Sequence, residues 1–143
     1  MIINNEIYWN VKIKASPSKV YEMLNTAEGR SKFWAESASE KEECVYFKFP
    51  NNQEYVSRII NRVKNKEWTI DYFNSLVNFT LESPDKEYTI LKMVNRDVPK
   101  FEIEEVNAGW VSVLLSLKCA CQWDLDLRNH DLSCTWDDHY VGN

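Results

Sequence analysis

Residues 42–95 contain a series of strand-like segments joined by very short turns. The turns fall at Pro50-Asn51-Asn52, Asn65-Lys66, Asn74-Ser75 and Pro84-Asp85, which are residues typical of turns. A connection between parallel strands needs about a dozen residues or more, so links this short allow only antiparallel neighbours. The segment therefore predicts an antiparallel meander with strands at Glu43–Phe49, Glu54–Val63, Glu67–Phe73, Leu76–Ser83 and Glu87–Asn95.

The residues before the meander predict one more strand and two short helices. Apolar and polar residues alternate over Glu6–Lys14, which is typical of a half-buried strand. Ser16 and Pro17 supply a helix N-cap and a first-turn proline, and Thr26 can cap a second helix that ends near Trp34. We therefore expect a sheet of about six strands, interrupted by two helices after the first strand.

A longer helix is predicted from Ala108 to Gln122, because apolar residues recur there at helical spacing. They form a stripe about 120° wide, enough to lie on a sheet: Trp110, Val113, Leu114, Leu117, Ala120 and Cys121. Val111 and Leu115 lie outside this stripe. Residues 123–143 are rich in aromatic and aliphatic side chains, so we expect them to fold back over the long helix and cover these two residues.

The length and charge of the chain limit its organisation and partners. A chain of 143 residues fits one domain, so we expect residues 1–143 to form a single domain with residues 123–143 as its C-terminal extension. The net charge is −5, and the last twenty residues hold five aspartates against Arg128 alone. Nucleic-acid binding is not expected, because it needs clustered basic residues. The acidic extension is instead a possible site for a protein partner.

The sequence also carries signals about compartment. The N-terminus lacks the basic start and long apolar run of a signal peptide, and no apolar stretch reaches the roughly 20 residues of a membrane helix. The four cysteines are too few for a disulfide scaffold. We expect a cytoplasmic protein whose cysteines are buried thiols.

Several stretches of sequence resemble a known superfamily. They are KFWAE at residues 32–36, GWVSVLLSLKCA at 109–120, DLRNHD at 126–131 and TWDDHYVGN at 135–143. Together with the order of elements, they are similar to the START-like, or SRPBCC, superfamily, and within it to the activator of heat-shock protein 90 ATPase homologue-like proteins. The resemblance implies an α+β helix-grip fold, in which a curved antiparallel sheet wraps around the long C-terminal helix.

The same resemblance implies a cavity between the long helix and the sheet that binds a hydrophobic small molecule, lipid-like or aromatic. A chaperone-associated or other protein-interaction role and a cyclase- or hydrolase-type enzyme are the alternatives. Chaperone activators of this group carry an additional domain, for which this chain has no room. The candidate pocket-lining residues are Trp9, Trp34, Phe47, Tyr55, Trp68, Tyr72, Phe79, Trp110, Leu114 and Leu117.

The C-terminal extension also contains candidate metal ligands and acid–base groups. His130 and His139 lie near Asp131, Asp137 and Asp138, but the two histidines are nine residues apart, which is not a usual zinc spacing. We therefore expect neither a metal nor another cofactor. A histidine beside an aspartate can also transfer protons, yet no placed nucleophile accompanies the pair, so no residue is assigned as catalytic. The structural alternative pairs Arg128 with Asp126 or Asp131 and packs Leu127, Leu132, Trp136 and Tyr140 inward.

Overall fold

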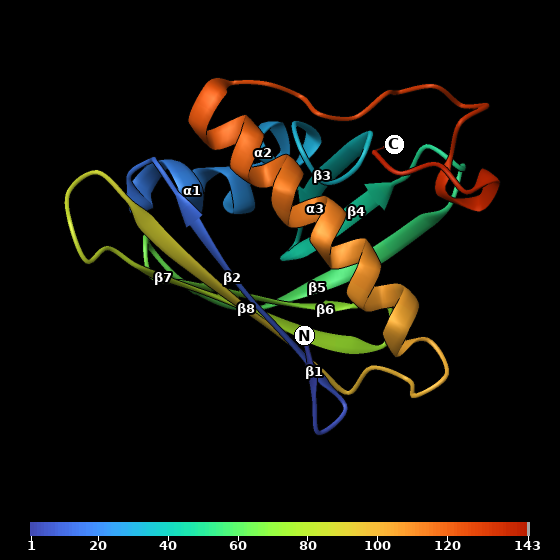
Figure 1. The fold of residues 1–143 in the computed structure, drawn as a ribbon, viewed down its shortest axis with the longest axis horizontal. Coiled ribbons are helices and arrows are strands. Elements are labelled where there is room, and N and C mark those ends of the chain that lie inside the picture. The colour runs from blue at the N-terminus through green and yellow to red at the C-terminus, as the bar shows by residue number, and fades with distance from the viewer. Residues whose placement is uncertain (143) are drawn as a thin grey trace.

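The computed structural model describes residues 1–142, and over these residues the chain forms one antiparallel sheet, three α-helices and a short 3₁₀-helix (Figure 1). The elements, in chain order, are β1 (Ile2–Ile3), β2 (Glu6–Ile13), α1 (Pro17–Asn25), α2 (Ala27–Ser31), β3 (Ser37–Lys41), β4 (Cys44–Lys48), β5 (Glu54–Val63), β6 (Glu67–Tyr72), β7 (Ser75–Glu82), β8 (Thr89–Arg96), α3 (Ile103–Trp123) and η1 (Trp136–Asp138).

The strands follow the order β1-β2-β8-β7-β6-β5-β4-β3 across the sheet. From β3 to β8 each strand pairs with the next in sequence. The part from β4 to β8 is the antiparallel meander that the short turns predict. The strand β2 pairs instead with the last strand, with Trp9 opposite Met93. The helices α1 and α2 therefore carry the chain from one part of the sheet to its far edge, and α3 lies across the same face (Figure 1).

The expected number of about six strands is wrong, because the described part of the chain has eight. The two that were missed are β1 and β3. The first has only two residues, too few to show an alternating pattern. The second has the sequence SASEK, in which Ala38 is the one buried residue, so no alternation of apolar side chains marks it.

The helix-capping signals act as predicted at the first two helices. The Ser16 hydroxyl accepts a hydrogen bond from the Lys19 backbone at 3.2 Å, and the Thr26 hydroxyl accepts one from the Gly29 backbone at 3.0 Å. The long helix begins at Ile103 and not near Ala108. Its first turn was missed because the N-cap residue, Glu102, makes no side-chain capping hydrogen bond.

The core lies between α3 and the covered face of the sheet. The predicted apolar stripe of α3 faces this core: Val113 is half-buried and the others, Trp110, Leu114, Leu117, Ala120 and Cys121, are buried. Val77, Phe79 and Leu81 share the buried face of β7, also as predicted. Within residues 1–142, none of the helices is both long enough and apolar enough to cross a membrane.

The C-terminal extension takes a different course from the one expected. It returns toward the start of α3 along the side of α2, where Arg128 bonds to carbonyls of Ser31 and Ala35 (Figure 1). Val111 and Leu115 stay 38% and 50% exposed, so the expectation that the extension covers them is wrong. The inward packing expected of the extension is also wrong for most of its apolar residues, since Trp136 is half-buried but Leu127, Leu132 and Tyr140 are exposed.

Candidate functional site

A cluster of aromatic rings fills the space between the middle of α3 and the sheet. Trp34, which follows α2, lies at its centre. Six ring centroids lie 5.0–6.0 Å from that of Trp34, and they belong to Phe33, Phe47, Trp68, Tyr72, Phe79 and Trp110. Rings at these separations are in contact, in tilted and edge-to-face arrangements. The middle of the space that could hold a ligand is therefore occupied by the protein's own side chains.

Most of the candidate pocket residues belong to this core. Phe47, Trp68, Phe79 and Trp110 are buried in the aromatic cluster, and Leu114 and Leu117 are buried farther along α3. Trp9 is half-buried and donates its indole N–H to Asn107 at 3.1 Å. Tyr55 stacks on Phe73 with 4.2 Å between ring centroids. Only Trp34 and Tyr72 of the ten candidates line the hollow described next.

A groove of about 470 Å³ remains open beside the cluster, along the N-terminal half of α3. Its opposite walls come from the β4–β5 turn, the β6–β7 turn, the β8–α3 link and η1. The lining residues are Trp34, Phe49, Pro50, Asn51, Gln53, Tyr72, Phe73, Ser75, Val98, Pro99, Glu102, Glu105, Val106, Gly109, Ser112, Val113, Trp136 and Asp137. Apolar and aromatic walls with a few polar groups are typical of small-molecule sites.

The two predicted residues that line the groove, Trp34 and Tyr72, are joined by a hydrogen bond. The Trp34 indole N–H donates to the Tyr72 hydroxyl at 3.2 Å. Burial raises the pKa of Tyr72, so its hydroxyl stays protonated at neutral pH. Because this hydroxyl accepts from Trp34, it keeps its own proton to donate to a ligand.

The C-terminal extension closes one end of the groove. The Trp136 indole N–H donates to a Glu105 carboxylate oxygen at 3.1 Å, which ties η1 to the first turns of α3. The Asn51 side-chain amide donates to an Asp137 carboxylate oxygen at 2.9 Å, which ties η1 to the β4–β5 turn. Both contacts join segments far apart in sequence, so they hold one wall of the groove in place.

Sequence patterns predict few of these groove residues. Phe49 and Phe73 are the last residues of predicted strands, and the sequence predicts Trp136 only as a packing residue of the extension. Gly109 was the available signal. An isolated glycine inside a helix weakens it, and here a Cβ at that position would meet nothing within 4 Å.

A second hollow, of about 580 Å³, lies on the sheet where the pairing of β5 is irregular between Ile59 and Asn61. It is lined by Glu43 and by residues 58–62 of one strand. No aromatic ring lines it. It is therefore less suited to a hydrophobic molecule than the groove beside α3.

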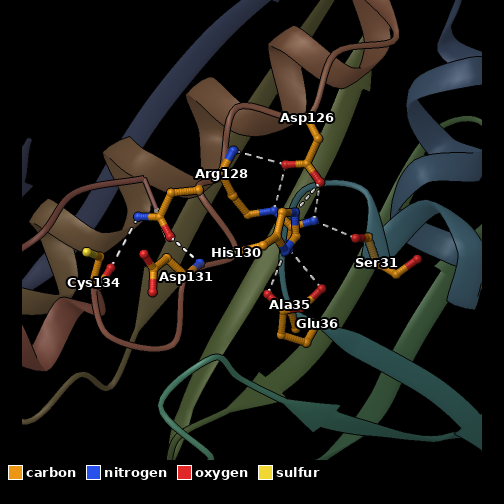
Figure 2. Close-up of polar contacts among 9 residues, drawn as sticks. Ser31, Ala35, Glu36, Asp126, Arg128, His130, Asp131 and Cys134 are labelled. Carbon is orange, nitrogen blue, oxygen red and sulfur yellow. Dashed lines mark hydrogen bonds and ion pairs between the residues drawn. The ribbon is translucent and has the colours of Figure 1, made fainter.

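A polar cluster around His130 anchors the extension outside the groove (Figure 2). His130 Nδ1 lies 2.8 Å from a Glu36 carboxylate oxygen, and Nε2 lies 2.7 Å from a carboxylate oxygen of Asp126. The buried Arg128 guanidinium bonds to Asp126 at 2.8 and 3.0 Å and to the Ala35 carbonyl at 2.8 Å. The expected pairing of Arg128 with Asp126 is therefore confirmed.

The pKa values in this cluster follow from its geometry. The hydrogen bond with Asp126 raises the pKa of His130; partial burial opposes this effect and Glu36 adds to it. Partial burial alone would raise the pKa of Asp126, but hydrogen bonds from Arg128 and His130 outweigh it and lower that pKa to about 2. Both shifts favour the charged forms, as is usual for paired groups.

This arrangement describes an anchor better than an acid–base centre. Both ring nitrogens of His130 face carboxylates, which leaves neither nitrogen free for a bound molecule. His139 is exposed and lies outside the cluster, and neither histidine lines the groove. In the described part of the chain no group of three His, Cys, Asp or Glu residues is arranged to hold a metal ion.

Comparison with solved structures shows the fold. The Aha1 dimer from Colwellia psychrerythraea has a TM-score of 0.70 and 25% identity, over 82% of this chain and 96% of that one. The conserved protein EF2215 from Enterococcus faecalis, whose function is unknown, has a TM-score of 0.71 and 19% identity, over 86% and 75%. DynU16, from the dynemicin biosynthetic locus, has a TM-score of 0.68 and 13% identity, over 82% and 47%.

The other two comparisons gave no match: no family model and no curated protein matches this chain. The structural neighbours, the large antiparallel sheet and the long C-terminal helix are together consistent with a helix-grip, SRPBCC-like fold. A shared fold does not specify a shared activity.

Proposed function

We propose that the protein binds a hydrophobic small molecule, lipid-like or aromatic, between the long helix and the sheet. The observation that supports this proposal is the groove of about 470 Å³ beside the aromatic cluster. That volume lies within the roughly 300–1,000 Å³ of common ligand sites. The groove occupies one end of the space that helix-grip proteins place between helix and sheet.

The walls suggest how such a molecule is held. The rings of Trp34, Phe49 and Phe73 offer flat apolar surface, and the Tyr72 hydroxyl offers one hydrogen-bond donor. A molecule with an aromatic or alicyclic body and one inward-facing acceptor atom matches these groups. We propose that the protein works in the cytoplasm, where its four free cysteines would stay reduced.

The test is to fill the groove from the helix. Gly109 lines the groove and has open space around it, so Gly109→Leu places a side chain where the ligand would lie. The matched control is Ala108→Leu, which adds the same side chain at an exposed neighbouring position outside the lining. Molecules that co-purify with the protein are identified by mass spectrometry, and a lipid and aromatic library is screened by thermal stability.

We expect the wild-type protein and Ala108→Leu to retain a ligand and to be stabilised by it, and Gly109→Leu to lose both properties. A bound ligand raises the melting temperature because it binds only the folded state. Retention of the same ligand by Gly109→Leu would contradict binding in this groove. The absence of any retained or stabilising molecule in the wild-type protein would contradict a binding function altogether.

Similarity to the Aha1 dimer supports a second candidate, a chaperone-associated or other protein-interaction role. We propose that the chain is related to the activator of heat-shock protein 90 ATPase homologue-like proteins, on the motifs at residues 32–36, 109–120, 126–131 and 135–143. The exposed aspartates of the extension would then contact the partner. Sedimentation of the wild-type chain, compared with Asp131→Asn and Asp137→Asn, tests whether it self-associates through this segment. A wild-type chain that stays monomeric at all concentrations would contradict self-association through this segment.

A further inference from the structure

The groove carries an uneven distribution of charge. Three of its lining residues are acidic, namely Glu102, Glu105 and Asp137, and none of those that the structure describes there is a lysine, an arginine or a histidine. Glu102 is the N-cap residue of α3 and Glu105 lies in its first turn, so the two glutamates are three residues apart and lie on the same side of the helix start. Asp137 lines the same groove from η1, which the Trp136–Glu105 hydrogen bond ties to the start of α3.

The helix terminus does not cancel this charge. The N-terminus of α3 is equivalent to roughly half a positive charge. Glu102 and Glu105 alone exceed it, and Glu104 lies on the same turn. Glu102 is half-buried, and its side chain makes no capping hydrogen bond to the helix. The lining of the groove therefore carries a net negative charge beside aromatic rings, although the Glu105 carboxylate already accepts from Trp136 and the Asp137 carboxylate from Asn51.

From these features we propose that the groove binds an amphipathic organic cation, with an apolar or aromatic body against Trp34 and Tyr72 and an ammonium group toward Glu102 and Glu105. This inference rests on the proposed binding function and adds the charge of the ligand. Carboxylates attract the ammonium directly, and aromatic faces attract it through their quadrupoles. An anionic ligand such as a fatty acid would be repelled by these carboxylates. The volume of about 470 Å³ suits a small molecule better than a folded partner.

The test compares three probes that share a naphthalene body and carry a cationic, a neutral or an anionic polar group. They are 2-(1-naphthyl)ethylamine, 2-(1-naphthyl)ethanol and 1-naphthaleneacetate, each titrated by isothermal calorimetry at pH 7 and low salt. We expect the amine to bind about fivefold tighter than the alcohol, as partly exposed ion pairs and cation–π contacts allow. We expect the carboxylate to bind weakest. Added salt should weaken amine binding and leave alcohol binding nearly unchanged.

Variants locate the effect in the groove. Glu102→Gln and Glu105→Gln should each reduce the preference for the amine over the alcohol, because they remove the charge and keep the shape. Glu104→Gln is the matched control, since Glu104 is an exposed residue of the same turn that does not line the groove. It should leave the preference unchanged. Thermal unfolding of all three variants checks that the fold survives.

Three results would overturn the inference or part of it. If the alcohol or the carboxylate binds as tightly as the amine, the proposed positive charge of the ligand is wrong, but the proposed binding function is not contradicted. If the amine does not bind, the inference is wrong whatever the alcohol does, and the library screen with Gly109→Leu decides the binding function separately. If Glu104→Gln and Glu102→Gln lose the preference for the amine equally, that preference comes from the overall acidity of the turn. The placement of the ammonium beside Glu102 and Glu105 would then be wrong.

Discussion

The two halves of α3 lie above the same sheet but meet very different surroundings. In the C-terminal half, Leu114, Leu117, Ala120 and Cys121 are all buried. In the N-terminal half, Val106, Gly109 and Val113 are half-buried and border the groove. The C-terminal half is thus buried against the core, whereas the N-terminal half buries Ile103 and Trp110 but also borders the open groove.

The difference comes from the elements that stand beside each half. The helix α1 packs against α3 as well as the sheet. The Lys14 backbone N–H also donates to the Gln122 side chain at 2.8 Å, which fixes the C-terminal end of α3 to the end of β2. The N-terminal half has turns and the C-terminal extension beside it instead. We therefore expect the stability of the fold and the proposed ligand binding to depend on different halves of α3.

The largest expected effect separates the two halves directly. Leu117→Ala should lower the free energy of unfolding by about 3 kcal/mol, because it leaves a cavity in a packed core. Val113→Ala should lower it by about 1 kcal/mol or less, since that side chain already borders open space. Urea unfolding followed by circular dichroism measures both values. Equal losses would show that the groove half is packed as tightly as the core half.

The next effect concerns the wall that the extension provides. Trp136→Ala should lower the free energy of unfolding by about 1–2 kcal/mol, less than for a fully buried tryptophan, because the ring is half-buried and donates one hydrogen bond. Trp136→Phe keeps a ring and should lose about half as much. Ligand dissociation should be faster in the alanine variant, as stopped-flow fluorescence can show. If Trp136→Ala changes neither the free energy of unfolding nor the ligand dissociation rate, Trp136 does not contribute to the groove wall.

The parts of the fold that follow periodicity were predicted from sequence. The meander, the strand over Glu6–Lys14, the caps at Ser16 and Thr26 and the buried stripe of α3 rest on local patterns that the tertiary structure keeps. The two missed strands depend on tight turns. At β1–β2 the turn residues Asn4 and Asn5 both have positive φ, and this Asn-Asn pair was a signal that could have been used.

The β3–β4 turn carried no such signal. It is formed by Glu42 and Glu43, which also have positive φ, although glutamate is not a usual residue for that conformation. The pairing of β4 with β5 and its neighbours holds the turn in place. Local sequence could not reveal a turn that tertiary contacts impose.

The groove was harder to predict than the fold, for a physical reason. Sequence shows that Trp34, Trp68 and Trp110 are apolar, but it does not show whether they leave space among them. In the structure Trp34 packs on the other two rings and closes the middle of the cavity. The groove walls come from turns, a helix terminus and the extension, which meet only in the folded chain.

A smaller effect, dependent on pH, tests the anchor that positions the extension. Because the pKa of His130 is raised in the folded protein, its contribution to stability is complete below the unfolded value of about 6.5 and is lost as pH rises through the folded value. A pair this exposed contributes about 1 kcal/mol or less. His130→Asn should therefore be less stable than wild type at pH 6, and this difference in the free energy of unfolding should shrink as pH rises to 9.

Urea unfolding at several pH values measures this difference, with His139→Asn as the control for losing an exposed histidine outside the cluster. The difference in the free energy of unfolding between this control and wild type should stay constant across the pH range. A deficit of His130→Asn that stays constant or grows with pH would contradict the paired, charged state of His130 and the anchor that it forms with Asp126 and Glu36.

The smallest effect runs in the opposite direction and bears most directly on the division between the two halves of α3. Gly109→Ala should raise the free energy of unfolding by about 0.5 kcal/mol, because alanine favours the helix and its Cβ meets nothing within 4 Å. The added methyl lies at the groove wall, so the same variant should bind a groove ligand no better than wild type, and more weakly if the ligand contacts α3 there. Thermal unfolding without ligand and calorimetry with ligand measure the two quantities on one protein. A loss of stability would mean that the wall at Gly109 is tightly packed, whereas a gain in stability together with tighter binding would show that Gly109 does not face the ligand.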